Sequence, residues 1–428
     1  MSAASVTQRE PRDVDELSTC LRDARRRSLS LLEDLDDERW IGPQLTIVNP
    51  PLWEIGHVAW FQEKWCLRHL AGRAPLRADA DRLFDSAAIA HDTRWHLAFP
   101  GRRDVLGYVE GVLASVEEQL AALPRADADT RYFHLLALYH EDMHGEAFVY
   151  TRQTHGYPPP RSAAPRGNGG GPCPGDVEIE GGSWRMGADP GEGFLFDNES
   201  RAHTVEVRPF RMARAPVTQA DFRAFVEDDG YRRRELWTAE GWSWRVNAAA
   251  EAPLYWKRQG EAWLRRHYDR WVPLEEHLPV HFVNAHEAEA WCRWAGRRLP
   301  TEAEWECAAG LARFPWGDDA ATAERAQLDL TADGPCEVGA HPAGDSRHGV
   351  RQMIGNVWEW TATTFEPYPG FEAGPYAEYS APWFGWQRVL RGGAFATRAR
   401  LLRNTWRNFY TPDRRDVLAG FRTCAPAQ

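Results

Sequence analysis

The sequence predicts a two-domain protein, with a helical bundle in its first part and an irregular α+β domain in its second. The chain has 428 residues, a length that suggests two or three domains. Residues 158–176 are dominated by Pro and Gly and carry no hydrophobic period, which is typical of a linker. We therefore expect one domain at 1–157 and another at 177–428.

Four amphipathic runs predict the bundle. Apolar residues recur at intervals of three and four in 14–35, 51–70, 105–123 and 131–153. This is the period of helices that bury one face. Four such helices fit a four-helix bundle, in which residues 71–104 form a long connection.

Short apolar runs broken by Gly, Pro and Asp predict the irregular domain. Helices are expected at 218–225 and 285–294, and short strands and long ordered loops elsewhere, so that loops carry the site. The chain has 21 Trp, most of them after residue 180. Such large, rigid side chains either pack an irregular core or line a binding cavity, and core packing is the simpler explanation for any one of them.

The charge balance and the cysteines exclude several classes of protein. Lys and Arg number 51 against 62 Asp and Glu, which gives a formal charge of −11 and argues against binding to nucleic acid or to an anionic membrane. No stretch approaches the roughly 18 apolar residues of a transmembrane helix, and residues 1–14 do not resemble a secretory signal. Seven scattered Cys without a CxxC motif predict reduced thiols in a cytoplasmic protein.

The strongest chemical signal is the segment HEDMHGE, which begins at His140. On a helix, His140 and His144 project from one face, and that stripe also carries Leu136, so both imidazoles should face the bundle interior. Buried neutral imidazoles need partners, and a divalent metal satisfies both. His57, on the apolar stripe of 51–70, is the candidate third ligand for iron, zinc or copper.

Plainer explanations exist for each of these residues. A His pair alone is a weak sign of a metal, and His57 on an apolar face can be a hydrogen-bonded core residue. Glu141 and Glu146 are expected to be solvated or to support the ligands, and His134 lies off the ligand face. The HExxH spelling also matches zinc proteases, but the second domain offers nothing that supports protease chemistry.

Motifs in both domains resemble a known family. One His in the second helix and HxxxHxE in the fourth resemble the DinB-like four-helix bundle. The second domain resembles the formylglycine-generating-enzyme (sulfatase-modifying-factor) fold, which is C-type-lectin-like. Its motifs are GGSWRMG at 181–187, PVT at 216–218, RLPTEAEWE at 298–306, GNVWEW at 355–360, RGG at 391–393 and GFR at 420–422. Together the two domains resemble the non-haem iron sulfoxide synthases of ergothioneine biosynthesis.

This resemblance implies a site and a reaction. It implies that His57, His140 and His144 bind Fe(II), and that O2 and iron join a chalcogen to imidazole C2 of hercynine, Nα-trimethyl histidine. Three neutral ligands leave positions for the substrate imidazole, a thiolate-like donor and O2. In GPYAEYSAPWF, Tyr376 matches the catalytic Tyr, whose phenol can donate a proton, or an electron with a proton. Taken alone, Tyr376 fits a packing aromatic equally well.

The segment RNTWRNFYTPDRR resembles the family's substrate-binding segment. Asn408 matches its Asn and Phe409 the aromatic that follows, although Phe409 alone also fits ordinary core. Aromatic faces with polar oxygens favour a quaternary ammonium group. Met143 is counted with these small-molecule-binding residues, and we expect the loops with Tyr376 and Asn408 to reach the histidines from across the metal.

Two departures bear on the donor. The actinobacterial ergothioneine enzymes grip γ-glutamylcysteine with two Arg three residues apart; here His91 stands at the first position and Arg94 at the second. Those enzymes also carry Trp-Asp after the Asn, where this chain has Phe409 and Tyr410. Losing two charge-assisted contacts would cost roughly 1.5–3 kcal/mol each, so we expect a donor other than γ-glutamylcysteine.

The selenoneine synthase branch, which joins hercynine to a selenosugar, fits that expectation. The segments NPPLWEIGHVAWFQEKW and DSAAIAHDTRW resemble that branch. Cysteine, γ-glutamylcysteine or another thiol remains the alternative donor. A formylglycine-generating oxidase would need a Cys pair that holds copper, and here Cys424 stands alone near the end. A non-enzymatic binding module would also fit the two domains, whereas a DinB-type thiol transferase would leave the second domain unexplained.

Overall fold

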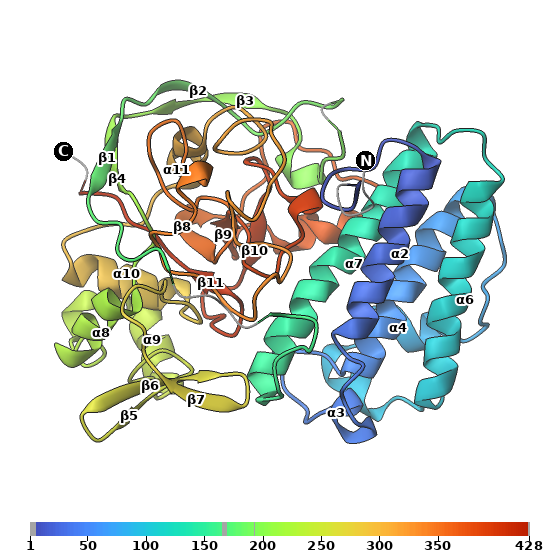
Figure 1. Cartoon of the computed structure of the whole chain (residues 1–428), viewed down its shortest axis with the longest axis horizontal. Helices are drawn as coiled ribbons and strands as arrows, with labels where there is room; N and C mark the ends of the chain where they lie inside the picture. The colour runs from blue at the N-terminus through green and yellow to red at the C-terminus, as the bar shows by residue number, and fades with distance from the viewer. Residues whose placement is uncertain (1–5, 165–168, 192, 427–428) are drawn as a thin grey trace. The chain divides into compact units, whose positions relative to one another are not determined.

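The computed structural model describes residues 6–164, 169–191 and 193–426 (Figure 1). The chain forms two compact units. The first comprises Met1–Ala163 with Thr397–Leu401, and the second comprises Ala164–Ala396 with Leu402–Gln428. This confirms the expected fold class, a helical unit followed by a mixed α and β unit. The return of the chain to the first unit at Thr397–Leu401 was not expected.

Four long helices form the first unit: α2 (Val14–Ser30), α4 (Pro51–Gln62), α6 (Arg102–Ala121) and α7 (Ala128–His155). They pack against one another as a bundle (Figure 1). The second predicted run continues past α4 as a π-helix, η1 (Glu63–His69). None of the described helices is both long enough and apolar enough to cross a membrane.

Local residues explain where these helices begin and end. The side chains of Asp13 and Asp127 accept hydrogen bonds from the first-turn amides of α2 and α7, which are otherwise unpaired. Pro51 starts α4, because a missing N–H costs nothing at the first position of a helix. Gly156 ends α7 at a φ of 68°, a conformation that glycine adopts without strain.

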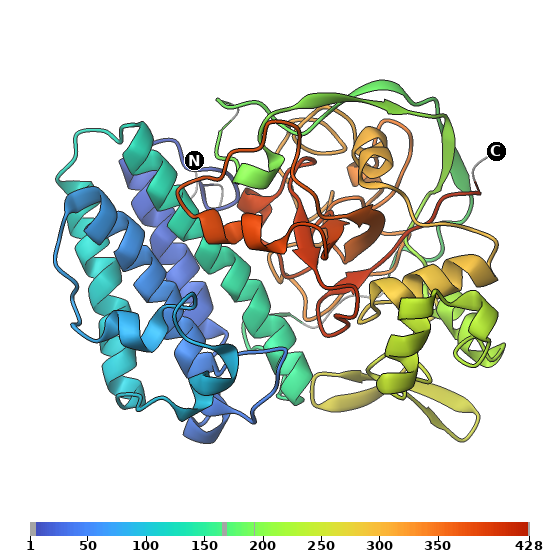
Figure 2. The ribbon, with the colours of Figure 1, turned by 180° about the vertical axis from the view of Figure 1, so that it is seen from behind.

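The second unit is built on small sheets, as the broken apolar runs predicted. Two-stranded sheets pair β1 (Asp176–Ile179) with β4 (Phe210–Ala213) and β2 (Gly182–Met186) with β3 (His203–Val207). A three-stranded sheet joins β5 (Trp256–Gln259), β6 (Ala262–His267) and β7 (Arg270–Pro273). A four-stranded sheet has the order β10 (Asn408–Tyr410), β9 (Arg388–Arg391), β8 (Trp358–Thr364) and β11 (Ala419–Gly420). Figure 2 shows these C-terminal strands at the centre of the unit.

The described part of this unit contains more helices than the sequence predicted. The expected pair is present as α8 (Gln219–Glu227) and α10 (Ala285–Trp294). Two further helices, α9 (Ala239–Asn247) and α11 (Glu302–Ala309), were missed. A capping box between Thr301 and Glu304 opens α11, and that spacing in the sequence was an available signal for it.

Buried ion pairs explain several of the motifs of the second unit. Arg391 of RGG pairs with Glu306 of RLPTEAEWE, and Arg422 of GFR pairs with Glu359 of GNVWEW, with a shortest N–O distance of 2.6 Å in the second pair. All four side chains are almost fully buried. A buried charge is stable only with a partner, so each pair fixes two distant segments to each other.

The expected linker lies partly along the second unit. The amide of Gly171 donates to Glu337 at 2.7 Å, and its carbonyl accepts from the amide of Gly339 at 3.0 Å. Ala164 also bridges to Ala332. Residues 165–168 of the expected linker lie outside the described residues.

Candidate metal centre

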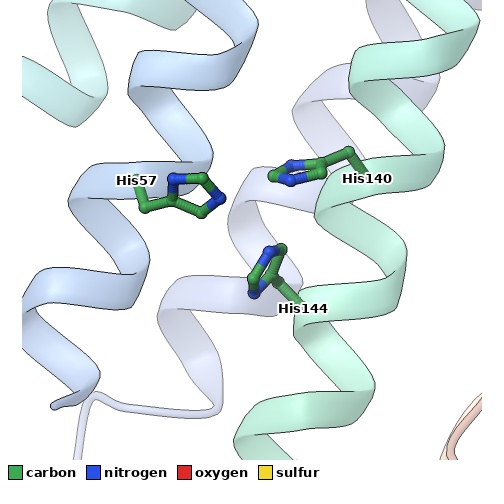
Figure 3. A group of neighbouring side chains, drawn as sticks. All are labelled: His57, His140 and His144. Atoms are coloured by element: carbon green, nitrogen blue, oxygen red, sulfur yellow. The ribbon is translucent and has the colours of Figure 1, made fainter. Parts of the chain in front are cut away.

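Three imidazoles meet inside the helical unit (Figure 3). His57 comes from α4, and His140 and His144 come from α7; one nitrogen of each ring lies within 4.8 Å of those of the other two. The ring centroids of His57 lie 5.0 Å from His140 and 5.1 Å from His144. In the described part of the chain, this is the one group of three or more His, Cys, Asp and Glu close enough to share an ion.

Hydrogen bonds leave one nitrogen available on two of these rings. Nδ1 of His57 lies 2.8 Å from the carbonyl oxygen of Phe84, which only accepts, so Nδ1 carries the proton. Nδ1 of His144 lies 2.6 Å from Oε1 of Glu54 and donates to that buried carboxylate. In both rings the lone pair is then on Nε2, where a metal can bind it.

Aromatic packing fixes the ring planes. The His57 ring stacks on Trp53 with centroids 4.9 Å apart, and the His140 ring stacks on Phe61 at 3.7 Å. Gly56 lets Phe84 approach α4, because a Cβ at this position would lie 2.2 Å from the Phe84 ring. The absence of a side chain at Gly56 thus places the carbonyl that orients His57.

The three side chains fit a divalent transition metal. Burial lowers the pKa of His57 and of His140 well below the usual value, so both rings are neutral at neutral pH. Neutral imidazole is the form that binds a metal. Three imidazole ligands suit iron, zinc or copper and leave further coordination positions open.

Glu54 was not among the predicted site residues. It lies three residues before His57, on the same face of α4. A carboxylate at that spacing on an otherwise apolar helix was the available signal. A carboxylate that accepts from the distal nitrogen of a ligand His orients the ring and raises its basicity. Glu54 is 1% exposed, and its hydrogen bond with His144 offsets part of the cost of burying the carboxylate.

The two glutamates of the HEDMHGE segment are buried, which excludes the solvated one of the two expected alternatives. Glu141 pairs with Arg25, whose Nε lies 2.8 Å from Oε1, and Glu146 accepts from Thr397. Because Arg25 holds Glu141, this carboxylate is not placed to serve as the general base of a zinc protease. His134 lies outside the cluster, with Nδ1 2.6 Å from the Thr130 carbonyl oxygen.

His91 and Arg94 lie on η2 (His91–His96) in the connection before α6, and both contact the segment that precedes α4. Nε2 of His91 is 2.9 Å from the carbonyl oxygen of Val48, and Arg94 donates to Oδ1 of Asn49 at 2.6 Å. The Arg94 guanidinium also lies 3.9 Å from the centre of the Trp53 ring, and burial lowers its pKa to about 10. Met143 is half-buried on α7, beside His144.

Tyr376 is half-buried in the second unit, at the start of the short helix η6 (Ala377–Tyr379). The loop around it is held from both ends by Asp197, which accepts from the hydroxyl of Ser380 and, at 3.2 Å, from the amide of Gly374. Asp197 was not among the predicted site residues, and no periodic pattern or motif marks it in the sequence.

The predicted substrate-binding segment is a strand and not a loop. Residues 408–410 form β10, which pairs with β9. Asn408 accepts from the amide of Phe409, and the Phe409 ring stacks on Phe365 with centroids 4.0 Å apart, a packing contact. The Tyr410 ring centre lies 5.3 Å from the guanidinium of Arg414.

Comparisons with known proteins agree with both units. The family model of the DinB superfamily matches residues 21–151, and that of the sulfatase-modifying factor enzyme 1-like domain matches residues 162–427. A hercynine oxygenase of Mycolicibacterium thermoresistibile is 38% identical over 430 residues, which cover 95% of this chain and 94% of that protein. One of Mycolicibacterium smegmatis is 36% identical over 420 residues, 93% of this chain and 96% of that protein.

A third relative matches part of the chain. The formylglycine-generating enzyme of Streptomyces coelicolor is 34% identical over 301 residues, which cover 63% of this chain and 95% of that enzyme. The two hercynine oxygenases match nearly the full length of this chain, so the similarity extends over both units. The chain belongs to the ergothioneine-type sulfoxide synthase family that includes the hercynine oxygenases, with a DinB-superfamily domain followed by a sulfatase-modifying-factor-like domain.

Proposed function

We propose that this protein is an Fe(II)- and O2-dependent oxygenase that joins a chalcogen donor to C2 of the imidazole ring of hercynine. The observation that carries the proposal is the group of His57, His140 and His144, whose nitrogens lie within 4.8 Å of one another. This group occurs in a chain that is 38% identical, over almost its full length, to a hercynine oxygenase.

Each residue of the site has a role in this proposal. Iron held by the three histidines would supply the activation of O2. Glu54 accepts the Nδ1–H of His144 and so leaves Nε2 of that ring for the metal, and the Phe84 carbonyl does the same for His57. Tyr376 supplies a proton, or an electron with a proton, and Asp197 holds its loop. Met143, Asn408, Phe409 and Tyr410 bind the small-molecule substrates.

For the donor we propose a selenosugar that carries a selenol. The C2–H bond of hercynine and the Se–H bond break, a C–Se bond forms, and selenium is oxidised to the selenoxide that precedes selenoneine. O2 accepts four electrons; one oxygen atom enters the selenoxide and the other leaves as water.

The contacts of His91 and Arg94 support a donor without the two carboxylates of γ-glutamylcysteine. Nε2 of His91 is engaged by the Val48 carbonyl, and a terminal nitrogen of Arg94 by Asn49. Neither residue forms the two-arginine clamp of the ergothioneine enzymes. Cysteine is the second candidate donor. The hydrogen bonds of the buried Arg94 guanidinium go to neutral oxygens, so its charge favours a donor that carries a carboxylate.

Formylglycine generation is a weaker candidate despite the likeness of the second unit. Cys424 is fully buried, and burial raises its pKa to about 12, so its thiol is protonated at neutral pH. The sequence has no other Cys after residue 336.

A competition assay tests the proposal. The Fe(II)-loaded protein is given hercynine and O2 with equal amounts of γ-glutamylcysteine, cysteine and a 1-selenosugar, and products are identified by mass spectrometry. We expect the selenoxide adduct to dominate and an iron chelator to stop its formation. A dominant γ-glutamylcysteine sulfoxide would overturn the selenium assignment, and no product from any donor would overturn the enzymatic function.

A further inference from the structure

Five residues near the C-terminus, Thr397–Leu401, belong to the helical unit. The residues on either side of them, Ala396 and Leu402, belong to the second unit. All five are buried, and three of their side chains bind α2 and α7 of the bundle through hydrogen bonds and ion pairs. The segment is thus part of the bundle that carries the three histidines, although more than 230 residues of chain separate it from α7.

Arg400 makes the main contact, to Asp142, which lies between His140 and His144 on α7. The guanidinium donates through Nε to Oδ2 and through one terminal nitrogen to Oδ1, both at 2.7 Å. Its other terminal nitrogen lies 2.9 Å from Asp23 on α2. A two-pronged pair of this kind fixes orientation as well as distance, because both groups are planar.

Thr397 repeats the contact one turn further along α7. Its hydroxyl donates to Glu146, which lies two residues after His144, as Asp142 lies two residues after His140. Two residues correspond to about 200° around a helix, so these contacts grip α7 on the face away from the imidazoles. Residues 142 and 146 share one face of α7, and residues 140 and 144 share another.

Because the contacts to Asp142 and Glu146 hold one face of α7, they control the rotation of this helix about its axis. A rotation of about 20° moves a side-chain atom roughly 5 Å from the axis by about 2 Å, which is the length of a metal–imidazole bond. Asp142 is almost completely buried, so breaking its ion pair with Arg400 would leave a buried charge without a partner, which is strongly destabilising.

We infer that Arg400 is a positioning residue for the metal centre: through Asp142 it fixes the rotation of α7 that points His140 and His144 at His57. The inference rests on the proposed function in one respect, since it takes these histidines to hold the metal. Arg400 itself contacts neither metal nor substrate; it acts through α7.

Arg152, which lies on α7, offers a matched control. It lies eight residues beyond His144, is almost as buried as Arg400, and also makes two bonds to one carboxylate, here through its two terminal nitrogens to Asp34, both at 2.8 Å. Arg400→Lys and Arg152→Lys both keep the positive charge, so neither variant leaves a buried carboxylate without a cation. Both lose the planar fork.

The test titrates Co(II) into the metal-free, full-length wild type and both variants, without hercynine or O2. We expect both variants to lower the melting temperature, but Arg400→Lys alone to weaken Co(II) binding about tenfold and to shift the visible absorption bands of the bound ion. Arg152→Lys should bind Co(II) as the wild type does. Unchanged affinity and bands in Arg400→Lys, or equal changes in both variants, would overturn the inference.

Thr397→Val is the second variant, since it removes only one hydrogen bond and leaves the ion pairs in place. We expect a smaller loss of Co(II) affinity in the same direction, and wild-type affinity in this variant would count against the positioning role of the segment. A wild type that binds no Co(II) overturns this inference and the proposed function together, whereas normal wild-type binding with unaffected variants overturns this inference alone.

Discussion

The histidines of the helical unit lie on α4 and α7, whose capped ends and apolar faces set their positions, whereas Tyr376 of the second unit lies in a loop that Asp197 holds. In the first unit, residues three and four apart share a face, so the geometry of the site follows from spacing. In the second unit, ion pairs and hydrogen bonds between distant segments take the place of that regular spacing.

Because of this difference, metal binding in the first unit and stability of the second unit should respond to different substitutions. Loss of a histidine should remove the metal without disturbing the second unit, and loss of a buried ion pair should destabilise the second unit without altering the ligands. The following variants test that separation, in order of decreasing effect.

The largest effect is expected from His140→Ala, because a two-histidine site holds a divalent metal far more weakly than a three-histidine site. We predict loss of bound iron and of turnover, measured by metal analysis after gel filtration and by product formation. His134→Ala is the control, since His134 is buried on the same helix but bonds to the Thr130 carbonyl. Equal iron content in the two variants would contradict the assignment.

The next effect is on the stability of the second unit. Arg422→Met leaves Glu359 buried without its cation, which should lower the free energy of unfolding by roughly 3–5 kcal/mol. Arg298→Met removes the partner of Glu304 at a more exposed site and should cost about 1 kcal/mol or less. Denaturant unfolding followed by Trp fluorescence measures both, and similar losses would show that burial does not set the strength of these pairs.

Tyr376→Phe should reduce turnover by about 100-fold, the lower range for loss of a proton donor, and change the product mixture. Metal affinity should stay at the wild-type value, because Tyr376 belongs to the other unit. Single-turnover rates and Co(II) titration measure the two quantities. Wild-type rate and products would remove Tyr376 from the mechanism.

Glu54→Ala should weaken metal binding by about 10–100-fold, because His144 loses the carboxylate that orients it. Glu54→Gln keeps an oxygen that accepts the Nδ1–H bond and should therefore lose less. Competition with a chelator measures both affinities. A larger loss in Glu54→Gln than in Glu54→Ala would mean that Glu54 acts in some way other than by orienting His144.

The smallest effect concerns pH. Burial raises the pKa of Asp197 above its ordinary value of 3.8, so the folded protein binds this proton more tightly than the unfolded chain does. The contribution of Asp197 to the free energy of unfolding should therefore fall as the pH rises from about 3.8 to the raised pKa, and then level off.

The wild type should accordingly lose stability relative to Asp197→Asn over that window and run parallel to it at higher pH. Melting temperatures of both proteins from about pH 4 to pH 7 give the difference. A difference that grows in favour of the wild type with rising pH would mean that the pKa of Asp197 is lowered instead.

The sequence predicted the helical unit well because its helices bury one face each. The four helices and the meeting of His57 with His140 and His144 follow from intervals of three and four residues. The same spacing argument could have identified Glu54, because it is a carboxylate three residues before the candidate ligand His57.

The remaining features depend on contacts that no local pattern encodes. Arg400 reaches Asp142 across 258 positions of sequence, and Ser380 reaches Asp197 across 183. The short helix α9 is Trp-rich and shows no clear apolar period, and Asn408 lies in a strand of only three residues. Such elements take their conformation from tertiary packing more than from local preference.

X-ray absorption at the iron edge of the Fe(II)-loaded protein tests the central claim most directly. The account predicts one iron per chain with three imidazole nitrogens at about 2.0–2.2 Å in the wild type, and loss of the bound iron in the His57→Ala variant. Iron that binds in less than equimolar amount, or a wild-type spectrum with fewer than three imidazole ligands, would contradict it.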